Sequence, residues 1–265
     1  MICLFPLKPS KWNDGVDKRV VVSCGQCIPC RINHARSWSI RIMHEASKYK
    51  DNCFMTLTYR DEDMPNVVFV RELQLFFKRM RKSGHVFKYY ACGEYGEKSM
   101  RPHYHVAFLG YSPVGKPGYV DLPQWPYGQV HFGALTPDSA QYVAGYHLKK
   151  FIGKDTSNLP SSPFAIMSRR PGIGDVSRVR YKSVPGSEDV PFVWRKGCKV
   201  GLPRFYKVKL GIESEIPDEP SLLHKLWRLD NSDIKGLRGA NPKKALDVRD
   251  NFMLNYKQSK KKGHL

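Results

Sequence analysis

The sequence predicts an α+β fold in which helices pack against a central antiparallel sheet. Two β-rich runs, residues 87–94 and 103–109, are separated by a short polar connection, as in a β-hairpin. Apolar residues recur at helical spacing in three other segments, near residues 31–49, 70–82 and 137–150. The chain has 265 residues, of which 41% are hydrophobic, enough to build the core of one sizeable domain.

The elements of the first half follow from local side-chain patterns. Residues 31–49 carry an apolar stripe, with arginines elsewhere around the helix cylinder. Residues 54–59, Phe-Met-Thr-Leu-Thr-Tyr, are β-rich and end in a polar run, which is typical of a strand. Residues 70–82 place a leucine, two phenylalanines and a methionine on one face of a second helix. The hairpin of residues 87–109 comes next.

A loop and a third helix follow the hairpin. Residues 110–135 are rich in Gly, Pro and aromatic residues and predict a loop with short strands, such as residues 129–132. Thr136 suits the N-cap and Pro137 the first position of a helix that runs to about Lys150.

The rest of the chain changes in composition. Residues 153–190 are dense in Gly, Pro and Ser and predict irregular, cationic structure, whereas residues 220–229 and 241–256 look helical ahead of a lysine-rich tail. We therefore predict a Cys-rich N-terminal segment with its helix, a functional core, a basic loop and strand region that completes the core, and a helical C-terminal region: residues 1–50, 51–155, 156–210 and 211–265.

The charge balance points to a polyanionic partner. Lys and Arg (44) outnumber Asp and Glu (24) by 20, and nucleic acid is the polyanion that so basic a protein commonly neutralises. A solvated cationic face without a specific partner is the alternative that charge leaves open. The sequence has no signal-type N-terminus and no window near the ~20 apolar residues of a membrane span, so we expect a soluble protein of the cytoplasm.

Two histidines in the second strand of the hairpin are candidate metal ligands. Alternate side chains of a strand share a face, so His103 and His105 project together. If Glu94 on the neighbouring strand projects from that face, the three residues form a site with positions open for phosphate oxygen and water. Such ligands favour Mg²⁺ or Mn²⁺, and zinc stays an alternative. Two polar residues on the wet face of a sheet are the other interpretation.

The third helix carries a stripe of candidate catalytic residues. Tyr142, Tyr146 and Lys149 stand at i, i+4 and i+7, and the opposite face is apolar and can anchor the helix to the sheet. A phenol with a pKa near 10 is a poor nucleophile, but a nearby cation and a metal-polarised phosphodiester would offset this weakness. Amphipathic packing is the alternative role for these tyrosines.

These motifs together resemble a known family. His103-Tyr104-His105 resembles the His-hydrophobe-His motif of HUH endonucleases, and residues 142–149 resemble their paired-tyrosine motif with its trailing lysine. The chain is more closely similar to the replication initiation proteins of gokushovirus-type single-stranded-DNA bacteriophages (Microviridae). The similar segments are spread over most of the chain up to about residue 210: residues 24–31, 54–62, 76–81, 91–96, 101–105, 142–150, 167–174 and 202–206.

The resemblance implies a ferredoxin- or RRM-like nickase core and an activity in rolling-circle replication. Such a protein cuts one strand at the phage origin through a 5′-phosphotyrosine intermediate and later rejoins it. Its partners would be single-stranded and supercoiled circular phage DNA in the cytoplasm of the infected bacterium. A host helicase and replication machinery would unwind and copy the DNA, because the sequence contains no Walker-type Gly-x-x-x-x-Gly-Lys-Ser/Thr segment.

The family's functional residues transfer to this chain position by position. His103, His105 and Glu94 become ligands of a catalytic Mg²⁺ or Mn²⁺. Tyr146 and Tyr142 become nucleophiles for alternate rounds, so that one holds the 5′-phosphate while the other attacks. The expected phosphate and DNA contacts come from basic residues: Lys149 beside the nucleophiles, and Arg101, Lys150, Arg169 and Arg170 elsewhere.

The cysteines predict a separate structural site. Cys24, Cys27 and Cys30 are too close together for a typical disulfide framework, and with Cys3 they would form a tetrathiolate zinc site. An iron–sulfur site resembles this spacing but lacks the usual fourth Cys followed by Pro. The remaining cysteines are expected to be buried small hydrophobes or unreactive thiols: Cys53, Cys92 and Cys198.

Two other functions stay open at this point. One is a non-catalytic, zinc-stabilised DNA- or RNA-binding protein whose histidines lie on the sheet by chance. The other keeps the HUH nickase chemistry but uses it in plasmid mobilisation or transposition. Two tyrosines four residues apart favour replication over single-tyrosine transposases.

Overall fold

The computed structural model describes residues 23, 25, 28–96, 99–149, 161–179, 192–195 and 198–211. Nearly all of them fall in one unit of the chain, Ile32–Glu213. The elements follow in the order α1 (Ile28–Ala46), β1 (Asn52–Leu57), α2 (Val70–Lys82), β2 (Lys88–Tyr95), β3 (Pro102–Leu109), β4 (Gly118–Val120), β5 (Val130–Ala134), α3 (Pro137–Lys149), β6 (Phe164–Met167), a 3₁₀ turn (Val176–Arg178), β7 (Phe192–Arg195), β8 (Cys198–Gly201) and α4 (Arg204–Lys209).

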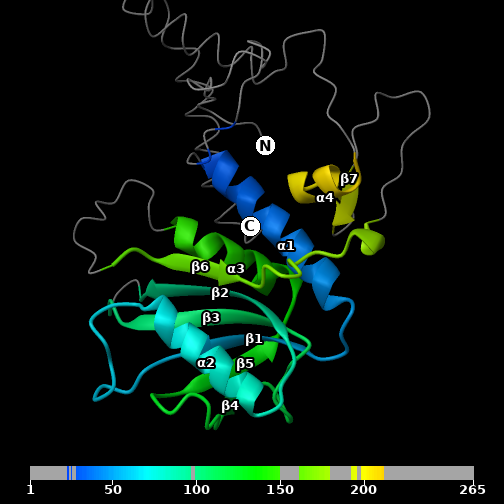
Figure 1. Cartoon of the computed structure of the whole chain (residues 1–265). Coiled ribbons are helices and arrows are strands. Elements are labelled where there is room, and N and C mark those ends of the chain that lie inside the picture. The colour runs from blue at the N-terminus through cyan, green and yellow to red at the C-terminus, as the bar shows by residue number, and fades with distance from the viewer. Residues whose placement is uncertain are drawn as a thin grey trace, which may run out of the picture. The chain divides into compact units, whose positions relative to one another are not determined.

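A six-stranded sheet forms the centre of this unit. Its strand order is β4-β5-β1-β3-β2-β6, and every neighbouring pair is antiparallel (Figure 1). β2 and β3 form the predicted hairpin in the middle of the sheet, and β4 and β6 are its edges. The predicted α+β fold with a central antiparallel sheet is therefore confirmed.

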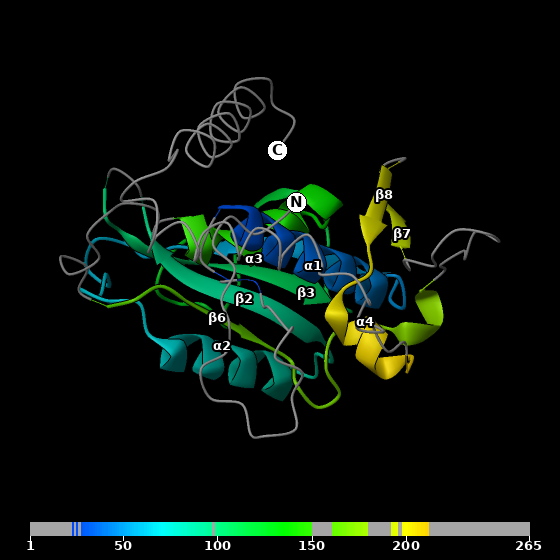
Figure 2. The same cartoon turned by 90° about the horizontal axis from the view of Figure 1, so that it is seen from above.

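Helices cover both faces of the sheet. α2 lies on one face, where its Leu73, Phe76, Phe77 and Met80 are buried against β1, β2, β3 and β5. α1 and α3 lie on the other face and share a second apolar cluster with β2 and β3 (Figures 1 and 2). The central strands are buried from both sides, so a side chain that projects from them enters one of two cores or a site between them.

The start of α3 follows the predicted capping pattern. Thr136 Oγ1 accepts a hydrogen bond from Ser139 N at 3.1 Å, and Ser139 Oγ accepts one from Thr136 N at 2.8 Å. This reciprocal pair satisfies two backbone donors at the end of the helix and fixes where the helix begins. Pro137 occupies the first helical position, as predicted.

Gly145 allows α3 to approach α1 closely. Glycine is a poor helix former, yet a Cβ built at Gly145 would lie only 3.2 Å from the Cβ of Ala35 in α1. Two small residues therefore face each other at the crossing. The close approach explains a residue that helix propensity alone disfavours.

The prediction of irregular structure over residues 153–190 is wrong at β6. Phe164–Met167 pairs with Tyr90, Ala91, Cys92 and Gly93 of β2 and forms the sheet edge. The strand has four half-buried residues with no alternation of polar and apolar side chains. Its pairing depends on β2, more than seventy residues earlier, so the local pattern gave no signal.

Several predictions fall on residues outside those described. They include the Cys-rich segment before residue 23 and the helices expected at residues 220–229 and 241–256. The four predicted regions of the chain therefore stay predictions. Among the described helices, none combines the length and the apolar character needed to cross a membrane.

Candidate metal and nucleophile site

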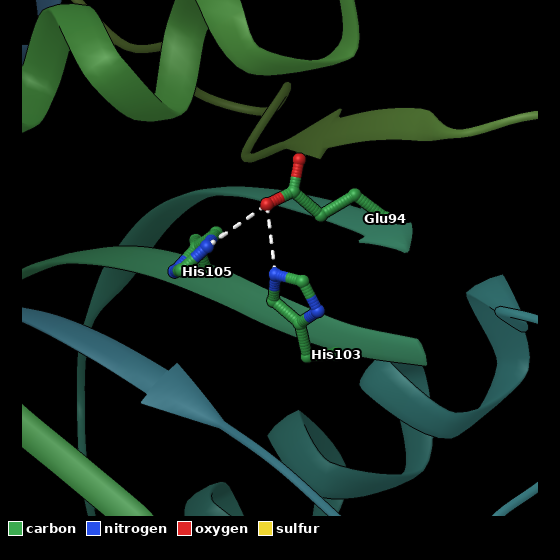
Figure 3. A group of neighbouring side chains, drawn as sticks. All are labelled: Glu94, His103 and His105. Carbon is green, nitrogen blue, oxygen red and sulfur yellow. Dashed lines mark hydrogen bonds and ion pairs between the residues drawn. The ribbon is translucent and has the colours of Figure 1, made fainter. Parts of the chain in front are cut away.

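The hairpin brings Glu94, His103 and His105 together on one face of the sheet. Glu94 pairs directly with His103, and Cys92 with His105, so the three side chains project toward α1 and α3. His103 Nε2 lies 2.8 Å from Glu94 Oε1, and His105 Nε2 lies 3.0 Å from the same oxygen (Figure 3). One ligand atom from each residue lies within 4.8 Å of the other two, close enough for one metal ion.

The second nitrogen of each imidazole is held by a neighbour. His103 Nδ1 lies 3.0 Å from the carbonyl oxygen of Arg101, and His105 Nδ1 lies 3.0 Å from Thr56 Oγ1 on β1. Such contacts fix the ring orientation and the tautomer of metal-binding histidines. Both Nε2 atoms are thereby aimed at the carboxylate.

The arrangement calls for a positive charge between these atoms. A carbonyl oxygen only accepts, so His103 Nδ1 donates its hydrogen to Arg101, and the Nε2 of a neutral ring then turns a lone pair toward Glu94. A proton or a metal cation would relieve that repulsion. Glu94 Oε2 is also buried without a hydrogen-bond partner among the described residues. Two imidazoles and an unsatisfied carboxylate oxygen fit a divalent cation.

Burial and hydrogen bonding act in opposite directions on Glu94. Burial of its fully covered side chain would raise its pKa, because a charged carboxylate is costly away from water. Contacts with His103 and His105 outweigh burial and lower the pKa of Glu94 below its ordinary value. The carboxylate is therefore ionised at neutral pH, the form that binds metal.

Tyr104 projects to the opposite face and anchors β3 there. Its hydroxyl accepts hydrogen bonds from Tyr59 Oη at 3.1 Å and from Phe69 N at 3.2 Å. These contacts lie in the core beneath α2. The His-Tyr-His motif thus places ligands on one side of the strand and a structural anchor on the other.

Helix α3 places Tyr142 over the histidine site. The Tyr142 ring lies edge-on to His105 with centroids 5.3 Å apart, and 6.0 Å from the Phe54 ring. Ala140, Val143 and Ala144 are fully buried and anchor the helix, as the apolar face predicted. Tyr142 therefore faces the site, although 36% of it is exposed.

Other predicted nucleophile and phosphate contacts are only partly described. Tyr146 and Lys149 lie within the bounds of α3, one and about two turns beyond Tyr142, but their side chains are outside the described part of the chain. Lys150 lies outside it altogether. Their assigned roles stay predictions.

The predicted DNA-contacting arginines differ in their surroundings. The Arg101 guanidinium pairs with Asp61 and donates to the carbonyl oxygen of Tyr59 at 2.9 Å, so it braces the chain next to His103. Arg169 and Arg170 are exposed just beyond β6. None of these contacts tests DNA binding, which stays a prediction for all three residues.

The cysteines are described in part. Cys30 is buried in α1, while Cys3, Cys24 and Cys27 lie outside the described residues, so the zinc site stays a prediction. Cys53 and Cys92 are fully buried, as expected. Burial raises the pKa of the Cys53 thiol to about 12, which makes it unreactive at neutral pH. The side chain of Cys198 is outside the described set.

Thr56 is the contact that the sequence reasoning missed. It lies in the strand that the sequence predicted, but nothing local indicates that it meets His105. The contact depends on the pairing of β1 with β3, which are about fifty residues apart in the chain. Only the alternation of Phe54, Thr56 and Thr58 hinted that a polar group faces the site.

The chain is similar to phage replication proteins. Residues 52–151 match the family of replication-associated proteins of the ORF2 type. The replication-associated protein VP4 of Bdellovibrio phage phiMH2K is 32% identical over 210 residues, which cover 69% of this chain and 65% of that protein. The replication-associated protein ORF2 of Spiroplasma virus 4 is 35% identical over 181 residues, 58% of this chain and 55% of that protein.

A more distant relative is the replication-associated protein ORF4 of Chlamydia phage 1, 26% identical over 163 residues, 52% of this chain and 41% of that protein. The chain thus spans less than two thirds of the length of each of these relatives. No solved structure matches it significantly. The predicted resemblance to phage replication proteins is confirmed.

Proposed function

Because this chain is a relative of phage replication-associated proteins, we propose that it initiates rolling-circle replication of a small circular phage genome by cutting one DNA strand. The observation that carries the proposal is the convergence of Glu94, His103 and His105 on one point beside a helix with two tyrosines. A sheet that merely exposed two histidines to water would not bury a carboxylate between them. The proposed class is an HUH-type nickase and strand transferase.

Glu94, His103 and His105 would hold the metal ion, expected to be Mg²⁺ or Mn²⁺. When bound, the ion would withdraw electron density from the scissile phosphate and so favour nucleophilic attack. The protein's own contribution is orientation. Thr56 and the Arg101 carbonyl fix the two imidazole rings, and burial keeps the ionised Glu94 in place.

The covalent step is a transesterification at phosphorus. The phenolic oxygen of Tyr146 or Tyr142 forms a bond to the phosphorus, and the bond between the phosphorus and the 3′-oxygen breaks. The phenolic proton is lost and the 3′-oxygen gains one, so the products are a 5′-phosphotyrosine and a free 3′-hydroxyl. The energy of the phosphodiester is retained in the new ester, which lets a later 3′-hydroxyl rejoin the strand.

Tyr142 and Tyr146 would alternate as nucleophiles. Residues at i and i+4 of a helix have Cβ atoms roughly 5–6 Å apart, so both phenols can address one phosphate position. Tyr142 already lies against His105, which supports its place at the site. Lys149, one further turn along the same stripe, would stabilise the phosphate charge.

The DNA and its accessory proteins belong to the same proposal. The strand would be presented as single-stranded or supercoiled circular phage DNA, contacted also by Arg101, Lys150, Arg169 and Arg170. A host helicase would open the duplex ahead of replication. The reaction would take place in the cytoplasm of the infected bacterium.

Trapping the covalent adduct tests the proposal. The full chain is incubated with single-stranded circular phage-type DNA and Mn²⁺, and a protein–DNA band that survives denaturation is sought. Peptide mapping should place the DNA within residues 142–146. At least one of the single variants Tyr142→Phe and Tyr146→Phe should still form the adduct, and the double variant should form none.

The outcomes separate the competing functions. An adduct on another residue, or an undiminished adduct in the double variant, would refute the paired-tyrosine mechanism. DNA binding without any adduct would support the non-catalytic nucleic-acid-binding alternative. Adduct formation on plasmid transfer-origin or transposon-end DNA, but not on phage-type DNA, would favour mobilisation or transposition.

A further inference from the structure

One row of side chains crosses the sheet from the metal site to its far edge. Paired residues of antiparallel strands share a face, so five residues in direct register line one side of β2, β3, β1, β5 and β4. In that order they are Cys92, His105, Thr56, His131 and Tyr119. The first three belong to the site or its surroundings, and the last two extend the same face beyond it.

The row passes from buried to exposed along its length. Cys92 is fully buried, 6% of His105 is exposed, and Tyr119 at the edge is 76% exposed. α3 packs on β2, β3 and β6, which accounts for the buried part. His131 is exposed on β5, and β4 forms the open edge of the sheet (Figure 1).

His131 and Tyr119 form an aromatic surface that we call the edge platform. Their ring centroids are 5.2 Å apart and their planes meet at 79°. An aromatic ring exposed to this extent is costly to leave in water and offers a flat face to a nucleobase. Exposed Lys116 and Asp121 flank β4 with opposite charges, so the rings dominate what this edge offers.

We propose that the edge platform stacks a base of the single-stranded DNA whose phosphate is held at the Glu94–His103–His105 site. This inference rests on the proposed function, which supplies the single strand. Three strand-to-strand steps separate β3 from β4, about 14 Å at the usual spacing, a distance that a few nucleotides span. The platform continues the face of the site, and the net charge of +20 suits a polyanion.

Stacking would orient the strand without reading its sequence. Every base has a π face, so the platform contributes affinity at a fixed place along the strand. The strand would then cross the sheet from the site between β2 and β3 toward β4. A short substrate that ends before the platform would lose this contribution.

The first test measures DNA binding without cleavage. A labelled deoxythymidine oligonucleotide of about 16 nucleotides is titrated with the full chain in the presence of a chelator and followed by fluorescence anisotropy. Tyr119→Ala and His131→Ala should each weaken binding about 5- to 100-fold, whereas Tyr119→Phe should bind like the wild type. Phe69→Ala is the matched control, because Phe69 is an aromatic residue with 47% exposure outside the row.

A second arm shows whether the lost affinity comes from a base. The same proteins are titrated with an abasic oligonucleotide of equal length, on which Tyr119→Ala should bind like the wild type. The salt dependence of binding should stay unchanged in Tyr119→Ala, whereas loss of a phosphate-binding cation lowers the slope by about one. Equal unfolding temperatures of wild type and variant would show that the fold is intact.

Two results would overturn the platform. One is equal binding of the thymidine oligonucleotide by wild type and Tyr119→Ala. The other is an equal loss on the abasic strand, which points to a protein or phosphate contact instead. The adduct assay decides the proposed function separately: a missing adduct with intact stacking refutes the nickase, and an adduct with no stacking effect refutes the platform.

Discussion

At the scale of single residues, the site depends on three side chains whose charges balance only with a cation. Glu94 is fully buried and ionised, and two imidazole nitrogens point at one of its oxygens. Removing both imidazoles leaves the carboxylate without neighbours that lower its pKa, and burial would then favour its neutral form. The histidines therefore support the metal site both as ligands and by keeping Glu94 charged.

His103→Ala combined with His105→Ala should abolish nicking and leave DNA binding largely intact. Phosphate contacts elsewhere on a chain of net charge +20 supply most of the affinity. Adduct gels measure the first effect and anisotropy the second. His85→Ala, which alters a histidine packed on Tyr111 away from the site, is the control. Normal nicking by the double variant would show that the site is misassigned.

Thr56→Val should weaken Mn²⁺ binding about 10–100-fold, because valine fills the space of threonine but cannot hold His105 Nδ1. Thr56→Ser should restore the affinity, since its hydroxyl can make the same contact. Calorimetric titration with Mn²⁺ measures both variants without requiring nicking. Equal affinity of the valine variant and the wild type would limit Thr56 to packing.

The sequence was most informative about residues whose geometry is local. Strand alternation alone predicted that His103 and His105 share a face, and the hairpin brought Glu94 opposite His103. Thr56 and His131 were beyond its reach, because their places depend on the order of strands in the sheet. Alternation gives the face of a strand, but only the folded sheet gives its neighbours.

At the scale of elements, α3 is held against both the sheet and α1. Its apolar face is fully buried, and Gly145 lies against Ala35 at the crossing with α1. The position of Tyr142 over His105 follows from this packing. A change at the crossing should therefore affect stability and the site together.

Gly145→Leu should lower the free energy of unfolding by about 1–3 kcal/mol, because a larger side chain has no room beside Ala35. Urea unfolding followed by circular dichroism measures the change. Adding Ala35→Gly should recover part of the loss by making room at the crossing. A leucine variant as stable as the wild type would show that α3 moves away from α1 at no cost.

Elements with strong local periodicity were predicted within a few residues. α2 has the predicted bounds, and β1, β2, β3 and α3 begin or end within two residues of the predicted segments. α1 starts and ends three residues earlier than predicted, and β6 was missed. β6 is short, lies at the edge and takes its register from β2, so its four residues carry too little pattern to identify it.

At the scale of the whole molecule, the chain is predicted to hold two kinds of metal at separate sites. The histidine site lies on described strands, whereas Cys3, Cys24 and Cys27 of the predicted zinc site lie outside the described residues. Their spacing predicts tetrathiolate binding independently of the sheet. The two sites can be distinguished by their ligands.

Protein purified without chelator should contain about one zinc per chain by elemental analysis. Zinc can also enter a histidine and carboxylate site, so the comparison of variants is decisive. Cys24→Ser with Cys27→Ser should lose the zinc, and His103→Ala with His105→Ala should keep it. Zinc lost from the histidine variant alone would assign the metal to the sheet, and no zinc in a folded wild type would leave the cysteines as ordinary thiols.

The His-Tyr-His order in β3 also acts as a check on strand register. A slip of one residue would turn both imidazoles into the apolar core under α2 and put the Tyr104 ring where the metal ligands belong. Only one alignment of the hairpin satisfies both faces at once. A divalent cation that binds the native site would therefore stabilise that alignment selectively, so metal binding would proofread the hairpin as the sheet assembles.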